Sequence, residues 1–200
     1  MNLGIYGGTF DPIHNGHVHA ANEILKNSPC DKIIFVPAAD PPHKKNNIIT
    51  PFEKRFQWIK MVIEHYKNID VSDLENSMNI SYSVDLFNQL SNNYKGHKLY
   101  IIMGSDMSAT FSTWKDYEEI LTLASPITLV RDYYQQAIDQ RLNNQQKNLF
   151  ENSILKIKTL DISSTFIKDE IKDSKDVRKF VPKNIHKEVQ EYYCYLKSKD

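Results

Sequence analysis

The sequence predicts an α/β fold in which a mostly parallel sheet carries helices on both faces. Two observations predict it. Short apolar segments rich in β-branched and aromatic residues alternate with amphipathic segments, and each apolar segment ends at turn-forming residues. With 200 residues and 40% hydrophobic content, the chain can build one well-buried core but hardly two. We therefore expect a single domain over residues 1–200, with a helical segment from about residue 163 onward.

Six segments are candidate strands, because each is short, apolar and rich in residues that favour a pleated sheet. They are Leu3 to Tyr6, Lys32 to Val36, Ile69 to Val71, Leu99 to Met103, Ile127 to Val130 and Leu155 to Thr159. Strands of this kind separated by helices form a doubly wound, Rossmann-like sheet.

The clearest helix follows the second strand. Thr50 and Glu53 have the spacing of a capping box, and Pro51 stands at the first helical position. Its apolar positions recur at intervals of four and three, which indicates core packing rather than a ligand site. These positions are Phe52, Phe56, Ile59, Ile63 and Tyr66.

A last helix is expected to begin near Pro182, and we assign it a packing role only. Its predicted buried stripe is Ile185, Val189, Tyr192 and Leu196. The Asn- and Gln-rich stretch from Gln135 to Asn152 is interpreted as a surface helix or an insertion, with an oligomer contact or a mobile flap as alternatives.

Composition limits the partners of this protein. Lys plus Arg and Asp plus Glu are 25 each, so the formal net charge is zero and nothing favours long nucleic acid or an anionic membrane surface. No basic leader followed by an apolar core and no membrane-length apolar run is present. Cys30 and Cys194 lie far apart and lack CxxC spacing. We expect a cytoplasmic protein with reduced thiols.

The run from Gly7 to His17, directly after the first strand, predicts a nucleotide phosphate site. Gly7 and Gly8 can adopt positive φ and admit a phosphate to the main chain, and Thr9 adds a hydroxyl donor. Asp11-Pro12 forces a turn before a helix that is expected to begin near His17. In an open parallel sheet this first loop lies at the switch point, where ligands bind.

Histidines follow in the same run. His14 and His17 are three residues apart, which places both rings on one side of the helix start, near its positive end. His14, His17 and His19 are also a candidate transition-metal site. We weigh against it, because no Cys or acidic cluster adjoins them and His19 should face elsewhere on the helix.

Two later strand ends carry polar groups that could reach the same place. Gly104-Ser105-Asp106 follows the fourth strand, with Asp106 suited either to a ribose or to capping a helix. Ser163, Ser164 and Thr165 open a helix after the sixth strand, and Lys168 follows one turn later. For Asp106 the two interpretations carry equal weight. Hydroxyls and amides at a helix start can also form an anion site, but for Ser163 to Thr165 the residues alone favour the helix cap.

The first loop resembles the GxFDxxHxGH motif of the nucleotidyltransferase superfamily, with Thr9-Phe10-Asp11, His14, Gly16 and His17 on the motif positions. Neither a GxxxxGK[ST] run nor a GxGxxG run is present. Further blocks, in order, resemble the bacterial nicotinate mononucleotide adenylyltransferases over most of the chain. They are Pro41-Pro42-His43-Lys44, Ser81-Tyr82-Ser83, Gly104-Ser105-Asp106-Met107, Phe111-Ser112-Thr113-Trp114 and Ile162-Ser163-Ser164-Thr165. The first, second and fourth of these favour this family over the related pantetheine-phosphate adenylyltransferases.

The resemblance implies roles for individual residues. Catalytic roles fall to His14, His17, Lys44 and Lys168, the histidines as donors to phosphates and the lysines as neutralisers of leaving-group charge. ATP and its phosphates are expected at Gly7, Gly8, Thr9, Phe10, Gly104, Asp106, Ser163, Ser164 and Thr165. The nicotinate nucleotide is expected at Ser83, Trp114 and Arg131, with the Trp114 ring stacked on the pyridine.

Two positions depart from the family pattern. Lys168 stands where the family usually has arginine, and it keeps the charge but loses the planar fork that can hold two phosphate oxygens. The family's RPG turn appears here as Arg131-Asp132-Tyr133, so we carry over only the arginine.

The implied reaction is attack by the 5'-phosphate of nicotinate mononucleotide on the α-phosphorus of ATP, with ATP and nicotinate mononucleotide as the small-molecule partners. Mg2+ is expected to arrive with ATP, and no dedicated metal site is predicted. Alternatives are adenylyl transfer to nicotinamide mononucleotide or phosphopantetheine, a non-catalytic nucleotide sensor, and a His-rich metal-binding protein. The sequence leaves the oligomeric state open.

Overall fold

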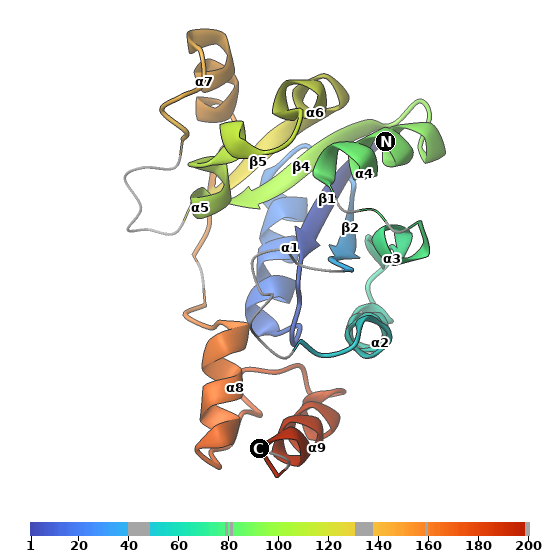
Figure 1. Ribbon diagram of the computed structural model, residues 1–200, viewed down its shortest axis with the longest axis vertical. Helices are drawn as coiled ribbons and strands as arrows, with labels where there is room; N and C mark the ends of the chain where they lie inside the picture. Colours follow the sequence, from blue (N-terminus) through green and yellow to red (C-terminus); the bar gives the residue numbers. More distant parts are fainter. Residues whose placement is uncertain (40–48, 79, 81, 131–137, 159, 199–200) are drawn as a thin grey trace.

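The computed structural model describes residues 1–39, 49–78, 80, 82–130, 138–158 and 160–198. Its centre is a parallel sheet with the strand order β3-β2-β1-β4-β5-β6 (Figure 1). The strands are β1 (Asn2–Gly8), β2 (Lys32–Pro37), β3 (Ile69–Val71), β4 (Lys98–Gly104), β5 (Ala124–Val130) and β6 (Ile154–Lys156). All six predicted strands are confirmed, although β6 begins one residue earlier and ends three residues earlier than expected.

Helices connect the strands and cover both faces of the sheet, as the Rossmann-like prediction requires (Figure 1). They are α1 (Asn15–Asn27), α2 (Phe52–Ile63), α3 (Leu74–Ser77), α4 (Ser83–Asn93), α5 (Ser105–Ser108), the 3₁₀ helix η2 (Phe111–Thr113), α6 (Tyr117–Leu123), α7 (Asn144–Glu151), α8 (Ser164–Lys172) and α9 (His186–Lys197). No helix in the described part of the chain combines the length and apolar character needed to cross a bilayer.

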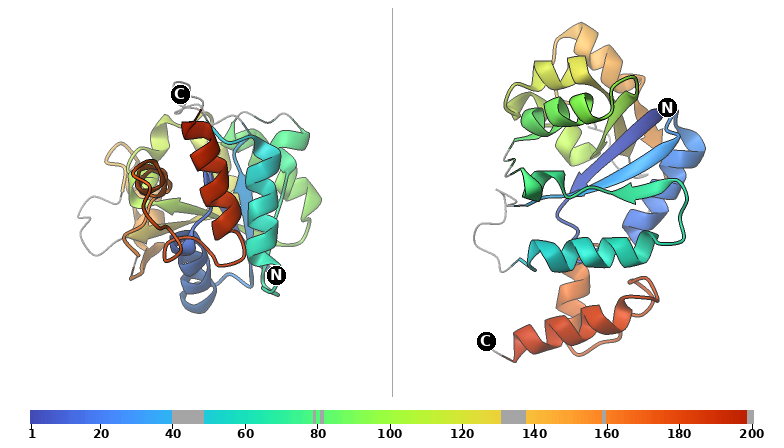
Figure 2. Two further views of the ribbon diagram at one scale, coloured as in Figure 1. Left: turned by 90° about the horizontal axis from the view of Figure 1, so that it is seen from below. Right: turned by 90° about the vertical axis from the view of Figure 1, so that its right-hand side faces the viewer.

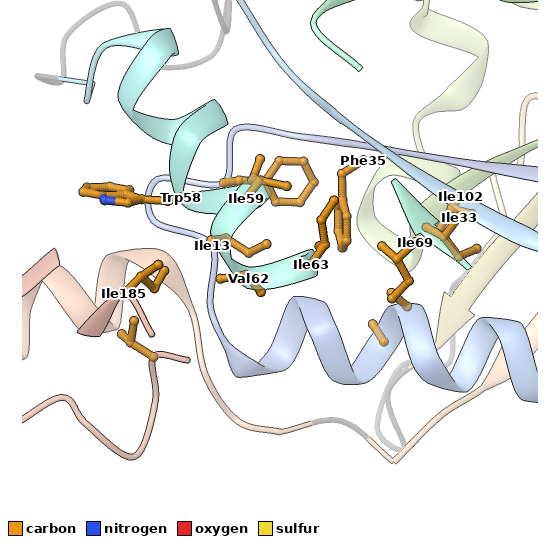
Figure 3. Packing of buried hydrophobic residues seen from close by; sticks show 14 of the residues in the cluster. Ile13, Ile33, Phe35, Trp58, Ile59, Val62, Ile63, Ile69, Ile102 and Ile185 are labelled. Atoms are coloured by element: carbon orange, nitrogen blue, oxygen red, sulfur yellow. The ribbon is translucent and has the colours of Figure 1, made fainter. Parts of the chain in front are cut away.

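The central strands bury side chains on both faces, which is why they read as continuous apolar runs. Along β4, Leu99, Ile101 and Met103 point into one cluster, whereas Tyr100 and Ile102 point into the other. The first cluster is covered by α3, α4, α6 and α7, and the second by α1, α2, α8 and α9. Figure 3 shows the second cluster reaching from Ile33 and Ile102 of the sheet outward to Trp58 and Ile185.

The helix predicted after Thr50 forms as α2, and Ile59 and Ile63 are buried as predicted. Its expected cap is wrong, and so is the rest of its expected buried face. No side-chain cap bond is made at its start, because Thr50 is buried and its Oγ1 lies 2.9 Å from the Tyr193 hydroxyl. Trp58 and Arg55 are buried instead of Tyr66, which lies beyond the helix end and is 38% exposed. Burial of Arg55 is possible because its guanidinium group finds protein acceptors, as described below.

The last helix, α9, begins at His186 rather than near Pro182. Ile185 and Val189 are buried as predicted, but the rest of the buried face differs. The buried members of α9 are Val189 and Tyr193, whereas Tyr192 is only half-buried. Figure 2 shows α9 running alongside α2, and the Lys54 Nζ to Glu188 Oε1 distance of 2.8 Å joins the two helices. The segment from residue 164 contains α8 and α9, and both pack into the cluster that α1 and α2 also cover.

The polar stretch after β5 contains the helix α7 in its described part, and the helix is anchored rather than purely on the surface. Asn143 caps α7 through a capping box with Gln146. Phe150 of this helix is fully buried and contacts Phe111, with ring centroids 5.2 Å apart. The interpretation as a surface helix is thus correct only for its polar face.

Candidate functional site

A pocket of about 420 Å³ lies at the carboxyl ends of β1, β4 and β5, where the strand order reverses between β1 and β4. This is the switch point at which open parallel sheets bind ligands. Seven predicted site residues line it: His14, His17, Gly104, Asp106, Ser163, Ser164 and Thr165. The structure therefore brings together three loops that are far apart in the sequence.

The phosphate loop, residues 7–14, has a conformation other than the one expected. Neither Gly7 nor Gly8 adopts positive φ; both end strand β1, and Phe10 instead has a φ of 50°. A Cβ on Gly8 would lie 2.9 Å from the Phe10 ring, so glycine is needed there for space. The ring of Phe10 is buried against Phe35, which leaves only its main chain able to meet a phosphate.

Two histidines stand at the start of α1, which begins two residues earlier than predicted. His14 is the N-cap residue and is buried, and its ring stacks on that of His17 with centroids 3.7 Å apart. The His14 amide donates to His17 Nδ1 at 3.3 Å. Because Nδ1 accepts, the neutral His17 ring carries its proton on Nε2, which makes Nε2 a hydrogen-bond donor. The edge of the Phe10 ring packs against His17, with centroids 4.9 Å apart, and fixes its orientation.

The prediction that His19 faces elsewhere is wrong, because His19 also lines the pocket. Its Nε2 donates to the Lys158 carbonyl at 2.6 Å, so the segment after β6 closes over this side of α1. In the described residues, no group of three or more His, Cys, Asp and Glu side chains is arranged to hold a metal ion.

Asp106 reaches the pocket from the first turn of α5 and is exposed there. The N-cap residue of α5 is Gly104, so Asp106 does not cap this helix. A Cβ on Gly104 would lie 2.6 Å from Asp106 Oδ1, and glycine thus makes room for the carboxylate. Ser108 ties α5 to β5, since its Oγ lies 3.0 Å from Thr128 Oγ1.

The Ser163 to Thr165 block caps α8 and also lines the pocket. Ser163 caps α8 by accepting a hydrogen bond from the Phe166 amide at 3.0 Å. Ser164 donates from Oγ to the Pro12 carbonyl at 3.0 Å, which joins α8 to the phosphate loop. All three residues nevertheless line the pocket, and Ser163 and Thr165 are exposed there.

Within the phosphate loop, the carboxylate of Asp11 is buried and contacts residues from three other segments of the chain. Oδ2 lies 3.0 Å from Lys168 Nζ, while Oδ1 accepts from the Tyr193 hydroxyl at 2.7 Å and the Thr50 amide at 3.3 Å. Burial by itself raises the pKa of Asp11, but these hydrogen bonds and the Lys168 charge outweigh it and hold the pKa below its ordinary value. Asp11 is therefore a carboxylate at neutral pH.

Arg55 is buried next to this group and clamps the backbone of the loop. Its Nε donates to the Thr50 carbonyl, Nη1 to Thr9 and Nη2 to Ala38, at 2.8, 2.7 and 2.8 Å respectively. Burial lowers the pKa of Arg55, and the charge of Asp11 counteracts part of that effect. The planar guanidinium is suited to three acceptors held in one plane.

A second predicted region lies at the start of α4 and before α6. Lys115 Nζ lies 4.4 Å from the centre of the Tyr82 ring, so the segments that carry Trp114 and Ser83 are adjacent. The Trp114 ring is half-buried against Phe111, with centroids 5.2 Å apart. Neither Trp114 nor Ser83 lines the 420 Å³ pocket.

The remaining predicted residues are placed as follows. Four residues form the base of the loop and do not line the pocket: Gly7, Gly8, Thr9 and Phe10. Lys168 does not line the pocket either, and it contacts Asp11 instead. Lys44 and Arg131 lie outside the described residues.

Sequence reasoning missed several residues that shape the site. Tyr6, His19, Leu129, Ile157 and Leu160 line the pocket. The apolar ends of β5 and β6 were a usable signal for its apolar wall, because strand ends converge at the switch point. The roles of Arg55, Thr50 and Tyr193 had no local signal.

Comparison with known proteins gives a consistent result. The sequence model of the cytidylyltransferase-like family matches residues 5–170. A Clostridium novyi protein named "Probable nicotinate-nucleotide adenylyltransferase" is 35% identical over 90% of this chain and 91% of its own. A Thermotoga maritima protein of the same name is 36% identical over 96% of this chain and 92% of its own. The solved structure of Plasmodium falciparum nicotinic acid mononucleotide adenylyltransferase complexed with NaAD has a TM-score of 0.73 at 20% identity, covering 98% of this chain and 95% of that one, which confirms the fold.

Proposed function

This chain belongs to the nicotinate-nucleotide adenylyltransferase family of cytidylyltransferase-like proteins, and we propose that it transfers the adenylyl group of ATP to nicotinate mononucleotide. The products would be nicotinate adenine dinucleotide (deamido-NAD) and pyrophosphate, a step in NAD synthesis. One observation carries the proposal. His14, His17, Asp106 and the Ser163 to Thr165 block converge on one pocket at the switch point of the sheet.

In the proposed reaction, an oxygen of the acceptor's 5'-phosphate forms a bond to the α-phosphorus of ATP. The bond from that phosphorus to the bridging oxygen of the β-phosphate breaks, and pyrophosphate leaves with the electron pair. An ionised phosphate needs no protein base, so catalysis can consist of in-line positioning and stabilisation of charge. Donors around the pocket are the residue types that this chemistry requires.

His17 is proposed as the donor to the transferring phosphoryl group. Its Nδ1 accepts from the His14 amide, which orients the ring and makes Nε2 the donor atom. His14 stacks on it at the start of α1, where the helix dipole also favours negative charge. The hydroxyls of Ser163 and Thr165, which line the same pocket, are proposed to bind ATP phosphates.

The two lysines receive different support. Lys44 stays in the proposal on the family resemblance alone, as the cation that neutralises charge on the leaving pyrophosphate. For Lys168, the 3.0 Å contact with buried Asp11 supports a role in fixing the phosphate loop. Lysine suits this point contact, because it has one compact charge where arginine has a fork.

Mg2+ belongs to the proposal as the companion of ATP. Among its described residues the pocket offers the Asp106 carboxylate and several hydroxyls as oxygen donors. Such a sparse oxygen set fits an ion that reaches the site on ATP phosphates and keeps several of its waters. When bound there, Mg2+ would offset the negative charge of the phosphates.

The acceptor's pyridine ring is proposed to stack on Trp114, with Ser83 as a polar neighbour of its carboxylate. The Lys115–Tyr82 contact supports this pairing, because it holds the two segments next to each other. Arg131 is kept as a further contact on the resemblance alone. We also place the reaction in the cytoplasm, and the free thiols of Cys30 and Cys194 support that location.

The test is pyrophosphate release from ATP and Mg2+ with nicotinate mononucleotide, nicotinamide mononucleotide and phosphopantetheine as parallel acceptors. Release that depends on nicotinate mononucleotide is expected. Equal or greater release with either other acceptor would replace the substrate assignment while keeping the enzyme class. ATP binding without release for any acceptor would overturn the proposal in favour of a nucleotide sensor.

A further inference from the structure

Helix α9 contacts the phosphate loop directly. Tyr193 of this helix is 8% exposed, and its hydroxyl donates to Asp11 Oδ1 at 2.7 Å. The same hydroxyl lies 2.9 Å from Thr50 Oγ1. Tyr193 thus links Asp11, which precedes β2 in the sequence, to Thr50, which follows β2.

We propose that Tyr193 is a positioning residue for adenylyl transfer, whose hydroxyl fixes Asp11 and thereby the phosphate loop. This inference rests on the proposed function for its kinetic consequences. It adds to that function a residue outside the motif blocks, on a helix that the sequence assigned to packing alone.

The path from Tyr193 to the pocket is short and rigid. Asp11 stands three residues before His14, the N-cap residue of α1. Of the two residues between them, Pro12 accepts a hydrogen bond from Ser164 through its carbonyl, and Ile13 is fully buried. A rotation of the Asp11 carboxylate should therefore shift the His14 backbone. The His17 ring, which stacks on the His14 ring, should shift with it. Displacements of about 1 Å in a positioned group can cost a hundredfold in rate.

Charged and titratable groups face Asp11 from three helices. They are Arg55 on α2, Lys168 on α8 and Tyr193 on α9. Thr50 adds two hydrogen-bonding groups from the segment before α2. Because the Tyr193 hydroxyl is one of the donors that lower the Asp11 pKa, its removal should raise that pKa. Protonation of Asp11 would then weaken its pair with Lys168 at a higher pH than in the wild type.

The experiment compares Tyr193→Phe with Tyr192→Phe in the full-length protein. Both substitutions delete one hydroxyl and keep the ring in the aromatic cluster with Trp58, whose centroid lies 6.2 Å from that of Tyr193 and 5.7 Å from that of Tyr192. For Tyr193→Phe we expect kcat to fall about tenfold, the scale of one hydrogen bond to a charged group, with KM for ATP changed less than about threefold. In the plot of its kcat against pH, the fall in kcat on the acidic side should begin at a higher pH than in the wild type. Tyr192→Phe should match the wild type in both respects.

Imidazole NMR spectra supply a second readout that does not depend on the substrate. The His14 and His17 ring signals should shift in Tyr193→Phe and stay in place in Tyr192→Phe. If the wild type shows no turnover but these shifts occur, the proposed function fails, whereas the role of Tyr193 in positioning the phosphate loop stands. An unchanged kcat, an unchanged acidic side of the plot of kcat against pH and unchanged histidine signals in folded Tyr193→Phe would overturn the inference, as would equal changes in Tyr192→Phe.

Discussion

Replacing Arg55 with methionine should destabilise the protein strongly, although methionine fills a similar volume. Arg55 is 1% exposed and donates to the carbonyls of Thr9, Ala38 and Thr50. Its removal leaves three carbonyls without this donor, with the Thr50 contact fully buried and the other two partly buried. It also takes a positive charge away from buried Asp11.

The magnitude follows from these contacts. Three hydrogen bonds from a charged donor, at about 1.5 to 3 kcal/mol each, sum to about 4.5 to 9 kcal/mol. Burial of the guanidinium group costs several kcal/mol in return, and the substitution recovers that cost. We expect a net loss of about 3 to 5 kcal/mol in the free energy of unfolding, in the range seen when buried charge networks are broken. Arg55→Lys should fall between methionine and wild type, because lysine keeps the charge but not the fork.

Urea unfolding at pH 7, followed by circular dichroism, measures this loss. Arg178→Met is the matched control, since Arg178 is exposed and forms a surface ion pair with Asp176, and it should leave the midpoint unchanged. A loss below about 1 kcal/mol for Arg55→Met would refute the reasoning. It would mean that the cost of burying the guanidinium group equals what its three hydrogen bonds contribute.

Three further predictions address the site. His17→Ala should lower kcat by about a hundredfold to a thousandfold with the fold intact, whereas exposed His97→Ala should not, and near-normal turnover would remove His17 from the mechanism. Trp114→Ala should raise KM for nicotinate mononucleotide about tenfold and spare KM for ATP; an equal rise in both would indicate that Trp114 only packs on Phe111. The lowered pKa of Asp11 stabilises the fold above the ordinary value of 3.8, and this stabilisation is lost as pH falls through the lower folded value. Asp11→Asn should therefore lose less stability than the wild type between pH 5 and the acid transition, and parallel stability curves would contradict the assignment.

The strands and the first loop were predictable because their signals are local. Each strand is a short apolar run, and a parallel sheet gathers the strand ends at one edge, so Asp106 and the Ser163 to Thr165 block could be named as candidates for one place. Their ligand roles came from the family resemblance, because the residues alone are equally typical of helix caps. The conformation of the loop was not predictable in this way. Positive φ falls on Phe10 rather than on a glycine, since the ring of Phe10 is held by burial against Phe35.

The errors have a common physical origin, which is that a partner far away in the sequence decides the outcome. Arg55 is buried because acceptors at Thr9 and Ala38 meet it in space, and hydrophobic periodicity cannot show this. Periodicity also cannot choose between adjacent tyrosines. Tyr193 rather than Tyr192 faces the core, where its hydroxyl finds Asp11.

The helices after β6 therefore form part of the site as well as of the core. Asn15, the first residue of α1, donates its amide to the Phe180 carbonyl at 2.9 Å and its side chain to the Lys179 carbonyl at 3.0 Å. Together with the bonds of Ser164 and Tyr193, these contacts hold the phosphate loop from its outer side. The sheet supplies the strand ends at which a nucleotide can bind, and the helices after β6 act with Arg55 to fix the loop that presents the histidines. Changes on the outer face of α8 or α9 should consequently affect stability alone, whereas changes at Lys168 or Tyr193 should affect stability and turnover together.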